Sequence, residues 1–235
     1  MKGFIKKAAV WLDNFWYHYK WHTIIAAFFI TVGAICTVQL VTRQSYDAYI
    51  MYAGGGVVFG EDEQAVKNAL EYVCDDYDGD GEKNLCLTVI TVLSDTELEE
   101  KQDAAASDGD KIGYNTADRA TALKNFDLEM MTGNSYLCIM SKYMYSRCDG
   151  QGRFVPLSDI FDEVPQSAAD EYSIRLADTE FGRYFSAAFA SMGEDCVVCL
   201  RRQSLSDAQS ERSPEEYEKY AQIFRNIASF RLKGE

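Results

Sequence analysis

The sequence predicts an α/β fold: an N-terminal interfacial plus transmembrane helix, followed by a mostly parallel sheet with helices on both faces. The first observation is an uncharged stretch, residues 23–42. As a helix, its twenty residues match the roughly 30 Å hydrocarbon core of a bilayer. The second observation is that apolar, β-branched segments then alternate with segments of helical periodicity. We therefore expect a membrane anchor and one outer domain with its own core.

The residues before the apolar stretch predict an amphipathic helix at the inner membrane interface. Aromatic residues recur there at helical spacing, as at Trp11, Phe15 and Tyr19, and lysines lie between them. All three tryptophans of the chain fall within residues 11–21, which is typical of an interfacial aromatic belt. We expect residues 4–42 to contact membrane lipid.

The basic residues around the apolar stretch predict its orientation. Four lysines and one aspartate precede it, and the cytoplasmic flank of a span is normally enriched in lysine and arginine. A cleaved signal peptide is disfavoured because the stretch is long and ends without an A-x-A site. We expect a signal anchor in the cell membrane, single-pass, with a cytoplasmic N-terminus and an extracellular C-terminal domain. The expected parts are a cytoplasmic juxtamembrane helix (1–22), a transmembrane helix (23–42), a tether (43–47) and an extracytoplasmic α/β domain (48–235).

The outer domain is predicted to begin with the order strand, helix, strand, helix, strand. The second strand is almost continuously apolar, as a strand buried on both faces would be. A strand joined to the next through a helix implies a right-handed crossover and parallel pairing. The predicted strands are 48–53, 85–93, 136–145, 172–176 and 196–201, and the predicted helices are 61–74, 116–133 and 214–227. Residues 181–189 are predicted as a short helix or an aromatic-rich turn, and residues 94–111 as a long surface loop with room for a short helical turn.

Charge and histidine content exclude several functions for the outer domain. Four of the 23 basic and one of the 37 acidic residues precede residue 43, so the remainder has a net charge of −17. Such a surface repels nucleic acid, and nucleic-acid binding is not expected. Both histidines, His18 and His22, precede the apolar stretch, so the outer domain lacks histidine nucleophile pairs, general bases and zinc ligands. We predict that it is not an enzyme.

An aspartate-rich loop gives the strongest local signal for a ligand. Asp76, Asp78 and Asp80 alternate with other residues and are followed by Gly81, which resembles the first half of a calcium-binding loop. Position 12 of such a loop needs a bidentate acid, but here it is Leu87, so the segment is not an EF-hand. We predict calcium binding by the three aspartates, and the alternative is a solvated turn.

The glycines at 54–56 and the cysteines carry weaker signals. The glycines follow the first strand but do not form a dinucleotide-binding fingerprint, so a plain loop is expected. Six cysteines lie beyond the anchor, which allows fifteen disulfide pairings and leaves the pairing open. Cys196 and Cys199 have CxxC spacing, but in a strand their side chains point to opposite faces, unlike those of a redox motif.

Four short segments together resemble uncharacterised single-pass, membrane-anchored proteins of clostridial Gram-positive bacteria. They are FWYHYKWH at 15–22, DGDG at 78–81, MTGNSYL at 131–137 and RLADT at 175–179. The resemblance implies that the outer domain is similar to one lobe of a type 2 periplasmic solute-binding protein. It implies a fold and a location, and no activity.

We expect a membrane-anchored extracytoplasmic binding or interaction module without catalytic activity, stabilised by calcium, whose ligand is an unidentified protein or small molecule. Two other functions stay open: the solute-binding component of a membrane transporter, and a carboxylate-dependent glycan hydrolase. A cleft between two lobes would favour the transporter component, and a compact single lobe would favour the module. Two carboxylates facing each other across a pocket at about 5 to 9 Å would favour the hydrolase.

Overall fold

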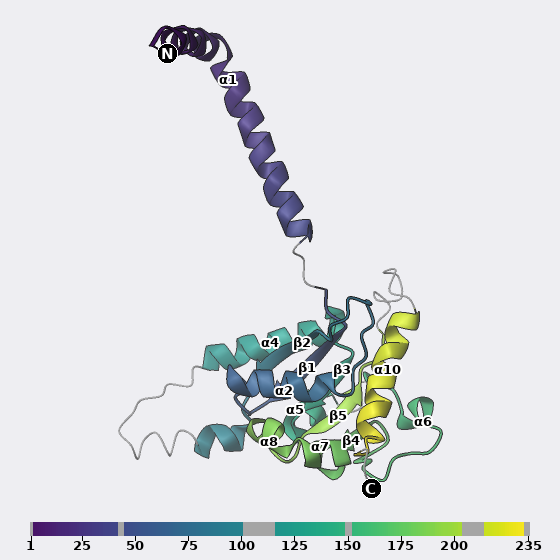
Figure 1. Cartoon of the computed structure of the whole chain (residues 1–235). Coiled ribbons are helices and arrows are strands. Elements are labelled where there is room, and N and C mark those ends of the chain that lie inside the picture. The colour runs from purple at the N-terminus through teal and green to yellow at the C-terminus, as the bar shows by residue number, and fades with distance from the viewer. Residues whose placement is uncertain (1, 42–44, 101–115, 149–151, 204–213, 233–235) are drawn as a thin grey trace. The chain divides into compact units, whose positions relative to one another are not determined.

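The computed structural model describes residues 2–41, 45–100, 116–148, 152–203 and 214–232 (Figure 1). Its internal contacts divide the chain into two compact units, Met1–Ser45 and Tyr46–Glu235. The first unit contains a single long helix. The second contains a five-stranded sheet with helices on both faces, which confirms the predicted fold class.

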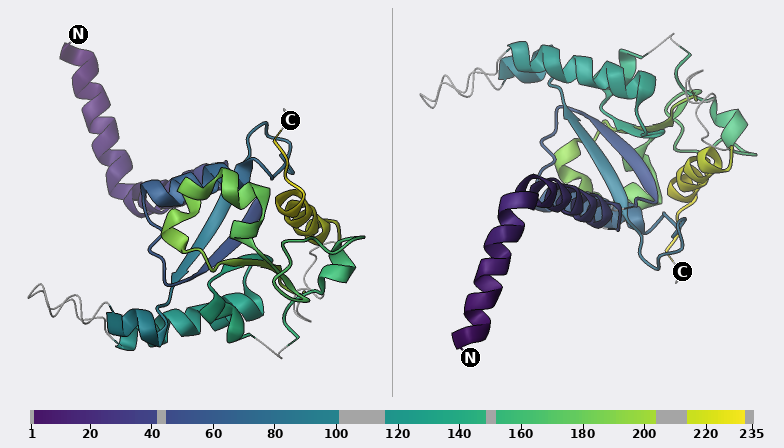
Figure 2. Two further views of the ribbon diagram at one scale, coloured as in Figure 1. Left: turned by 90° about the horizontal axis from the view of Figure 1, so that it is seen from below. Right: turned by 90° about the horizontal axis from the view of Figure 1, so that it is seen from above.

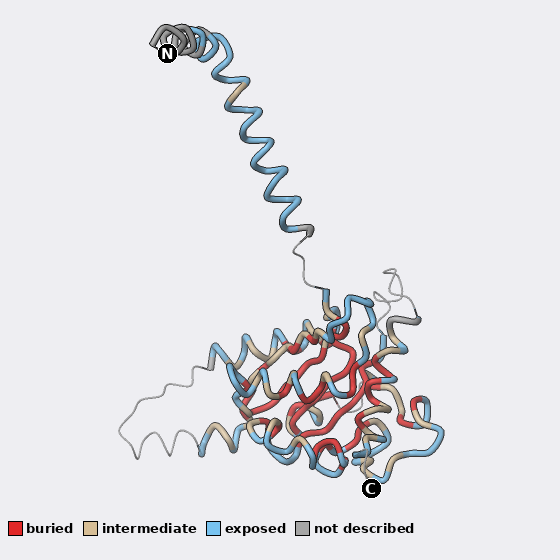
Figure 3. Tube along the Cα trace, viewed as in Figure 1, coloured by how far each residue is buried: buried red, intermediate tan, exposed pale blue. Residues whose placement is uncertain are grey.

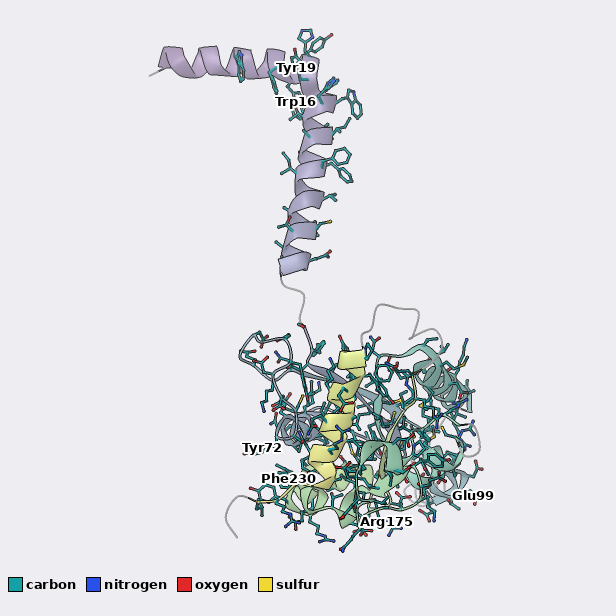
Figure 4. All side chains as sticks on the ribbon, turned by 90° about the vertical axis from the view of Figure 1, so that its right-hand side faces the viewer. Trp16, Tyr19, Tyr72, Glu99, Arg175 and Phe230 are labelled. Carbon is teal, nitrogen blue, oxygen red and sulfur yellow. The ribbon has the colours of Figure 1, made fainter. Side chains whose placement is uncertain are left out.

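Helix α1, Lys2–Val41, forms the described part of the first unit. Within it Phe15–Gln39 is long and apolar enough to cross a membrane, and none of that segment is buried inside the protein. Three threonine hydroxyls in the segment donate to the carbonyl four residues earlier, as Thr31 does to Ala27 at 2.9 Å, so these polar groups need no water. The helix changes direction near Trp16 and Tyr19 (Figure 4).

The sheet of the second unit has the strand order β2-β1-β3-β5-β4. β1 is the second strand in this order and pairs in parallel with β2 and β3, as predicted from the helical crossovers. β5 pairs antiparallel with both β3 and β4, which makes the sheet mixed. The strands are β1 Ala48–Gly54, β2 Leu85–Thr91, β3 Leu137–Met140, β4 Ser173–Arg175 and β5 Val197–Leu200.

Helices cover both faces of the sheet (Figure 2). On one face lie α2, α7, α8 and α10, and on the other lie α4 and α5. The named helices are α2 Glu61–Glu71, α4 Thr116–Thr132, α5 Lys142–Ser146, α6 Leu157–Ile160, α7 Glu180–Tyr184, α8 Ser186–Phe189 and α10 Pro214–Ala228, with 3-10 turns η1 Leu176–Asp178 and η2 Ala190–Met192.

The alternation of side chains along β1 produces two separate cores. Ile50 and Tyr52 pack toward α2 and α10, whereas Met51 and Ala53 pack toward α4 and α5. The strands are the most deeply buried part of the chain (Figure 3). Cys196 belongs to the first core and Cys199 to the second, which confirms that their side chains point to opposite faces.

The predicted third strand, 136–145, is wrong beyond Met140. Ser141 follows the strand, and its hydroxyl accepts a hydrogen bond from the amide of Met144, so α5 begins there. The methionine and tyrosine pattern that suggested a longer strand instead belongs to a short helix. In the predicted loop 94–111, residues 95–100 form the short helical turn that was allowed there, and residues 101–111 lie outside the described residues.

Candidate functional site

Gly54 ends β1, and Gly55 and Gly56 follow it at the carboxyl edge of the sheet, where open α/β sheets usually bind ligands. The Tyr52 hydroxyl accepts a hydrogen bond from the Gly56 amide (3.0 Å) and donates one to the Met192 carbonyl (3.2 Å). A Cβ at Gly56 would collide with the backbone carbonyl of Ser191, whereas one at Gly55 would meet only the end of the flexible Glu97 side chain. Close packing within the protein therefore requires a glycine at position 56.

A cavity of about 440 Å³ lies farther along the same edge. It is formed at the end of β3 by Lys142, at the end of β4 by Arg175, and just before β5 by Glu194 and Asp195. We call it the carboxyl-edge pocket. Its volume falls within the roughly 300–1,000 Å³ typical of small-molecule sites. Figure 4 marks the position of Arg175 on the second unit.

The carboxyl-edge pocket has a fixed polar wall. One oxygen of the Asp170 carboxylate accepts hydrogen bonds from the Tyr145 hydroxyl (2.9 Å), the Ser173 hydroxyl (2.9 Å) and the Tyr172 amide (2.8 Å). Burial raises the pKa of Tyr145, so its hydroxyl remains a donor at neutral pH. Because the wall also contains cationic and acidic side chains, it offers charges of both signs to a ligand.

The structure brings two of the three predicted metal ligands together with a third acid. Asp47, Asp76 and Asp78 each offer a carboxylate oxygen, and these oxygens lie within 4.8 Å of one another. Oxygens that share one Ca²⁺ at 2.3–2.6 Å lie up to about 5 Å apart, so the spacing suits calcium. Asp80 is not part of this cluster, and its carboxylate accepts from the Glu82 amide at 2.8 Å.

Asp47 was not predicted, and it holds the aspartate-rich loop to the sheet. It is 2 % exposed. One carboxylate oxygen accepts from the amides of Tyr77 (2.6 Å) and Asp78 (3.2 Å), and the other accepts from the amide of Asn84 (2.8 Å). The only sequence signal was an acid directly before a strand.

The cysteines are poorly suited to thiol chemistry. All seven have free thiols. Burial raises the pKa of Cys196 to about 12 and that of Cys148 to about 11, which keeps both as unreactive thiols at neutral pH.

No family model, curated protein or solved structure matches this chain.

Proposed function

We propose that the chain is a membrane-anchored, extracytoplasmic binding module without catalytic activity, which binds a small charged ligand in the carboxyl-edge pocket. The observation that carries the proposal is this pocket, which lies at the ligand-binding edge of an α/β sheet in a unit that follows an apolar helix. Lys142 and Arg175 can bind an anionic group of the ligand, and Glu194 and Asp195 can bind a cationic one.

The anchor and its orientation belong to the same proposal. None of Phe15–Gln39 is buried inside the protein, and an unburied apolar helix of this length is suited to a lipid environment. Lysines precede the segment, which supports a cytoplasmic N-terminus in the cell membrane and an extracellular second unit.

The architecture favours the module over the two rival functions. Tyr46–Glu235 is one compact unit around one sheet, which is consistent with a single lobe of a type 2 solute-binding fold. A solute-binding component of a transporter would enclose its ligand between two such lobes. A glycan hydrolase would require two carboxyl groups, one acting as acid and one as base, at a matched separation. In the carboxyl-edge pocket the acidic side chains lie with basic ones, a combination that suits the binding of a charged ligand.

A ligand screen on the full chain in lipid nanodiscs tests the pocket. The probes are glutamate, lysine, betaine and inorganic phosphate, with binding measured by calorimetry. We expect a probe that carries both charges to bind, and Lys142→Ala and Arg175→Ala each to weaken it at least tenfold. Lys124→Ala removes an exposed lysine outside the pocket and is the matched control. Equal weakening by the control, or binding unaffected by either pocket variant, would refute the proposal.

We further propose that Ca²⁺ stabilises the second unit through Asp47, Asp76 and Asp78. The spacing of their oxygens supports this, and millimolar affinity is typical of extracellular calcium sites. At 5 mM Ca²⁺ and a Kd of about 1 mM, the gain is about 1 kcal/mol, or roughly 2–4 °C in Tm. We expect this rise in the wild type and in Asp80→Asn, and none in Asp76→Asn/Asp78→Asn. Equal melting temperatures in calcium and in chelator would remove the metal from the proposal.

A further inference from the structure

A second cavity, of about 480 Å³, lies where α10 ends. Its walls come from three parts of the chain: the segment 165–167, the turn from η1 into α7, and the residues that follow α10. We call it the α10-end pocket. It adjoins the carboxyl-edge pocket, because Arg175 of the first is ion-paired with Asp178 of the second at 3.6 Å.

One wall of the α10-end pocket is an aromatic ring held in place by other rings. The centroid of Phe230 lies 5.4 Å from that of Phe181, which is fully buried, and 6.0 Å from those of Tyr184 and Phe185. The ring of Tyr72 lies 5.2 Å from that of Phe185 and so belongs to the same group of rings; Figure 4 labels Tyr72 and Phe230. Tyr72 and Tyr184 are 70 % and 54 % exposed, so two further aromatic side chains beside the pocket are accessible to solvent.

The remaining walls are polar and balanced in charge. Two carboxylates, Asp178 and Glu180, face the same cavity as two guanidinium groups, Arg183 and Arg231. Arg183 is held to this turn by a hydrogen bond from its Nη2 to the Asp178 carbonyl (3.0 Å). The amide of Gln166 adds both a donor and an acceptor. The lining thus holds equal numbers of acidic and basic side chains and is rich in hydrogen-bond donors and acceptors.

We propose that the α10-end pocket binds a neutral saccharide. A pyranose ring has one face of C–H groups, which pack against the negative face of an aromatic ring, and Phe230 is the aromatic residue that lines this pocket. Adjacent sugar hydroxyls both donate and accept. Carboxylates that only accept and guanidinium groups that only donate satisfy them together. The exposed rings of Tyr184 and Tyr72 provide stacking surfaces for further sugar units, so the ligand is an oligosaccharide. This site goes beyond the charged-ligand pocket proposed above and does not depend on it.

The test uses the full chain in lipid nanodiscs, without glycoside detergents, which carry sugar head groups of their own. The probes are cellohexaose, maltohexaose and N-acetylated chitohexaose, observed by saturation-transfer NMR and by calorimetry. We expect at least one to bind and its protons to be saturated on one ring face. Phe230→Ala should weaken this binding at least tenfold. Glu180→Gln changes an exposed side chain without removing packing and should weaken it at least threefold.

Two controls separate the site from its surroundings. Phe59→Ala removes an exposed aromatic ring outside both pockets and should leave saccharide affinity unchanged, as should Lys142→Ala in the carboxyl-edge pocket. Raising NaCl from 50 to 500 mM should change the affinity for a neutral ligand less than twofold. Failure of all three saccharides to bind, or binding that survives both Phe230→Ala and Glu180→Gln, would overturn the proposal. Loss of charged-ligand binding in Lys142→Ala with saccharide binding intact would support two separate sites.

Discussion

Replacing Asp47 by alanine should destabilise the second unit by about 3–5 kcal/mol. Its carboxylate accepts three backbone hydrogen bonds, from Tyr77, Asp78 and Asn84. Each hydrogen bond to a charged group contributes roughly 1.5–3 kcal/mol, which gives an upper range of about 5–9 kcal/mol. Tyr77 and Asp78 lie on an exposed loop, so water can satisfy their amides in the variant, and this lowers the expected loss.

Urea unfolding of the full chain in nanodiscs measures the loss. The three tryptophans all lie in α1, so tyrosine circular dichroism in the near ultraviolet is the signal to follow for the second unit. Asp80→Ala is the matched control, because Asp80 is exposed and accepts a single local amide, and it should cost less than about 1 kcal/mol. If Asp47→Ala were no more destabilising than Asp80→Ala, the view that Asp47 fixes the loop to the sheet would be refuted.

Three further predictions concern the core and the carboxyl edge. Arg201→Met should lower the free energy of unfolding in urea by about 3–5 kcal/mol. The buried guanidinium donates to three carbonyls at the end of α4 and stacks on the Tyr136 ring at 4.6 Å. A decrease below about 1 kcal/mol would contradict this. Gly56→Ala should lower the free energy of unfolding by about 1–3 kcal/mol, since the added Cβ would meet the Ser191 carbonyl. An unchanged melting temperature would show that the loop is not tightly packed. Burial raises the pKa of the Cys196 thiol from 9.0 to about 12, so between these two pH values the thiol is deprotonated in the unfolded chain but still protonated in the folded one. Stability should therefore fall by about 1.4 kcal/mol per pH unit from this thiol between pH 9 and 12, and Cys196→Ala should reduce that slope.

Local patterns in the sequence were sufficient to predict most of the elements. Helix α4 was predicted to within one residue of its C-terminal end, because its apolar stripe and Gly133 are both local features. The buried strands were equally visible in their continuous apolar composition. β3 was predicted too long because the apolar residues after Met140 are compatible with a buried strand and with a buried helix. The Ser141 side chain caps the N-terminus of α5, so these residues are helical.

What the sequence could not predict depends on pairing between distant segments. The β1–β2 register places Asp47 beside Asn84, whose carbonyl accepts a hydrogen bond from the Asp47 amide at 2.8 Å. Asp47 therefore lies at the predicted aspartate-rich loop, although it precedes Asp76 by 29 positions in the sequence. The antiparallel direction of β5 likewise follows from its neighbours, and it places Glu194 and Asp195 at the carboxyl edge. Neither pocket has a continuous sequence motif, because each is built from several separate segments.

The proposed function depends on which side of the membrane holds the second unit, and thiol labelling in intact cells determines that side. The native thiols of that unit are buried or partly buried, so an exposed cysteine introduced as Lys124→Cys dominates the reaction with a membrane-impermeant maleimide. Lys7→Cys, before the apolar segment, is the partner variant. We expect the Lys124→Cys chain to be labelled in intact cells and the Lys7→Cys chain to be labelled only after lysis. Labelling of Lys7→Cys in intact cells, with Lys124→Cys protected until lysis, would reverse the topology and contradict the proposed function.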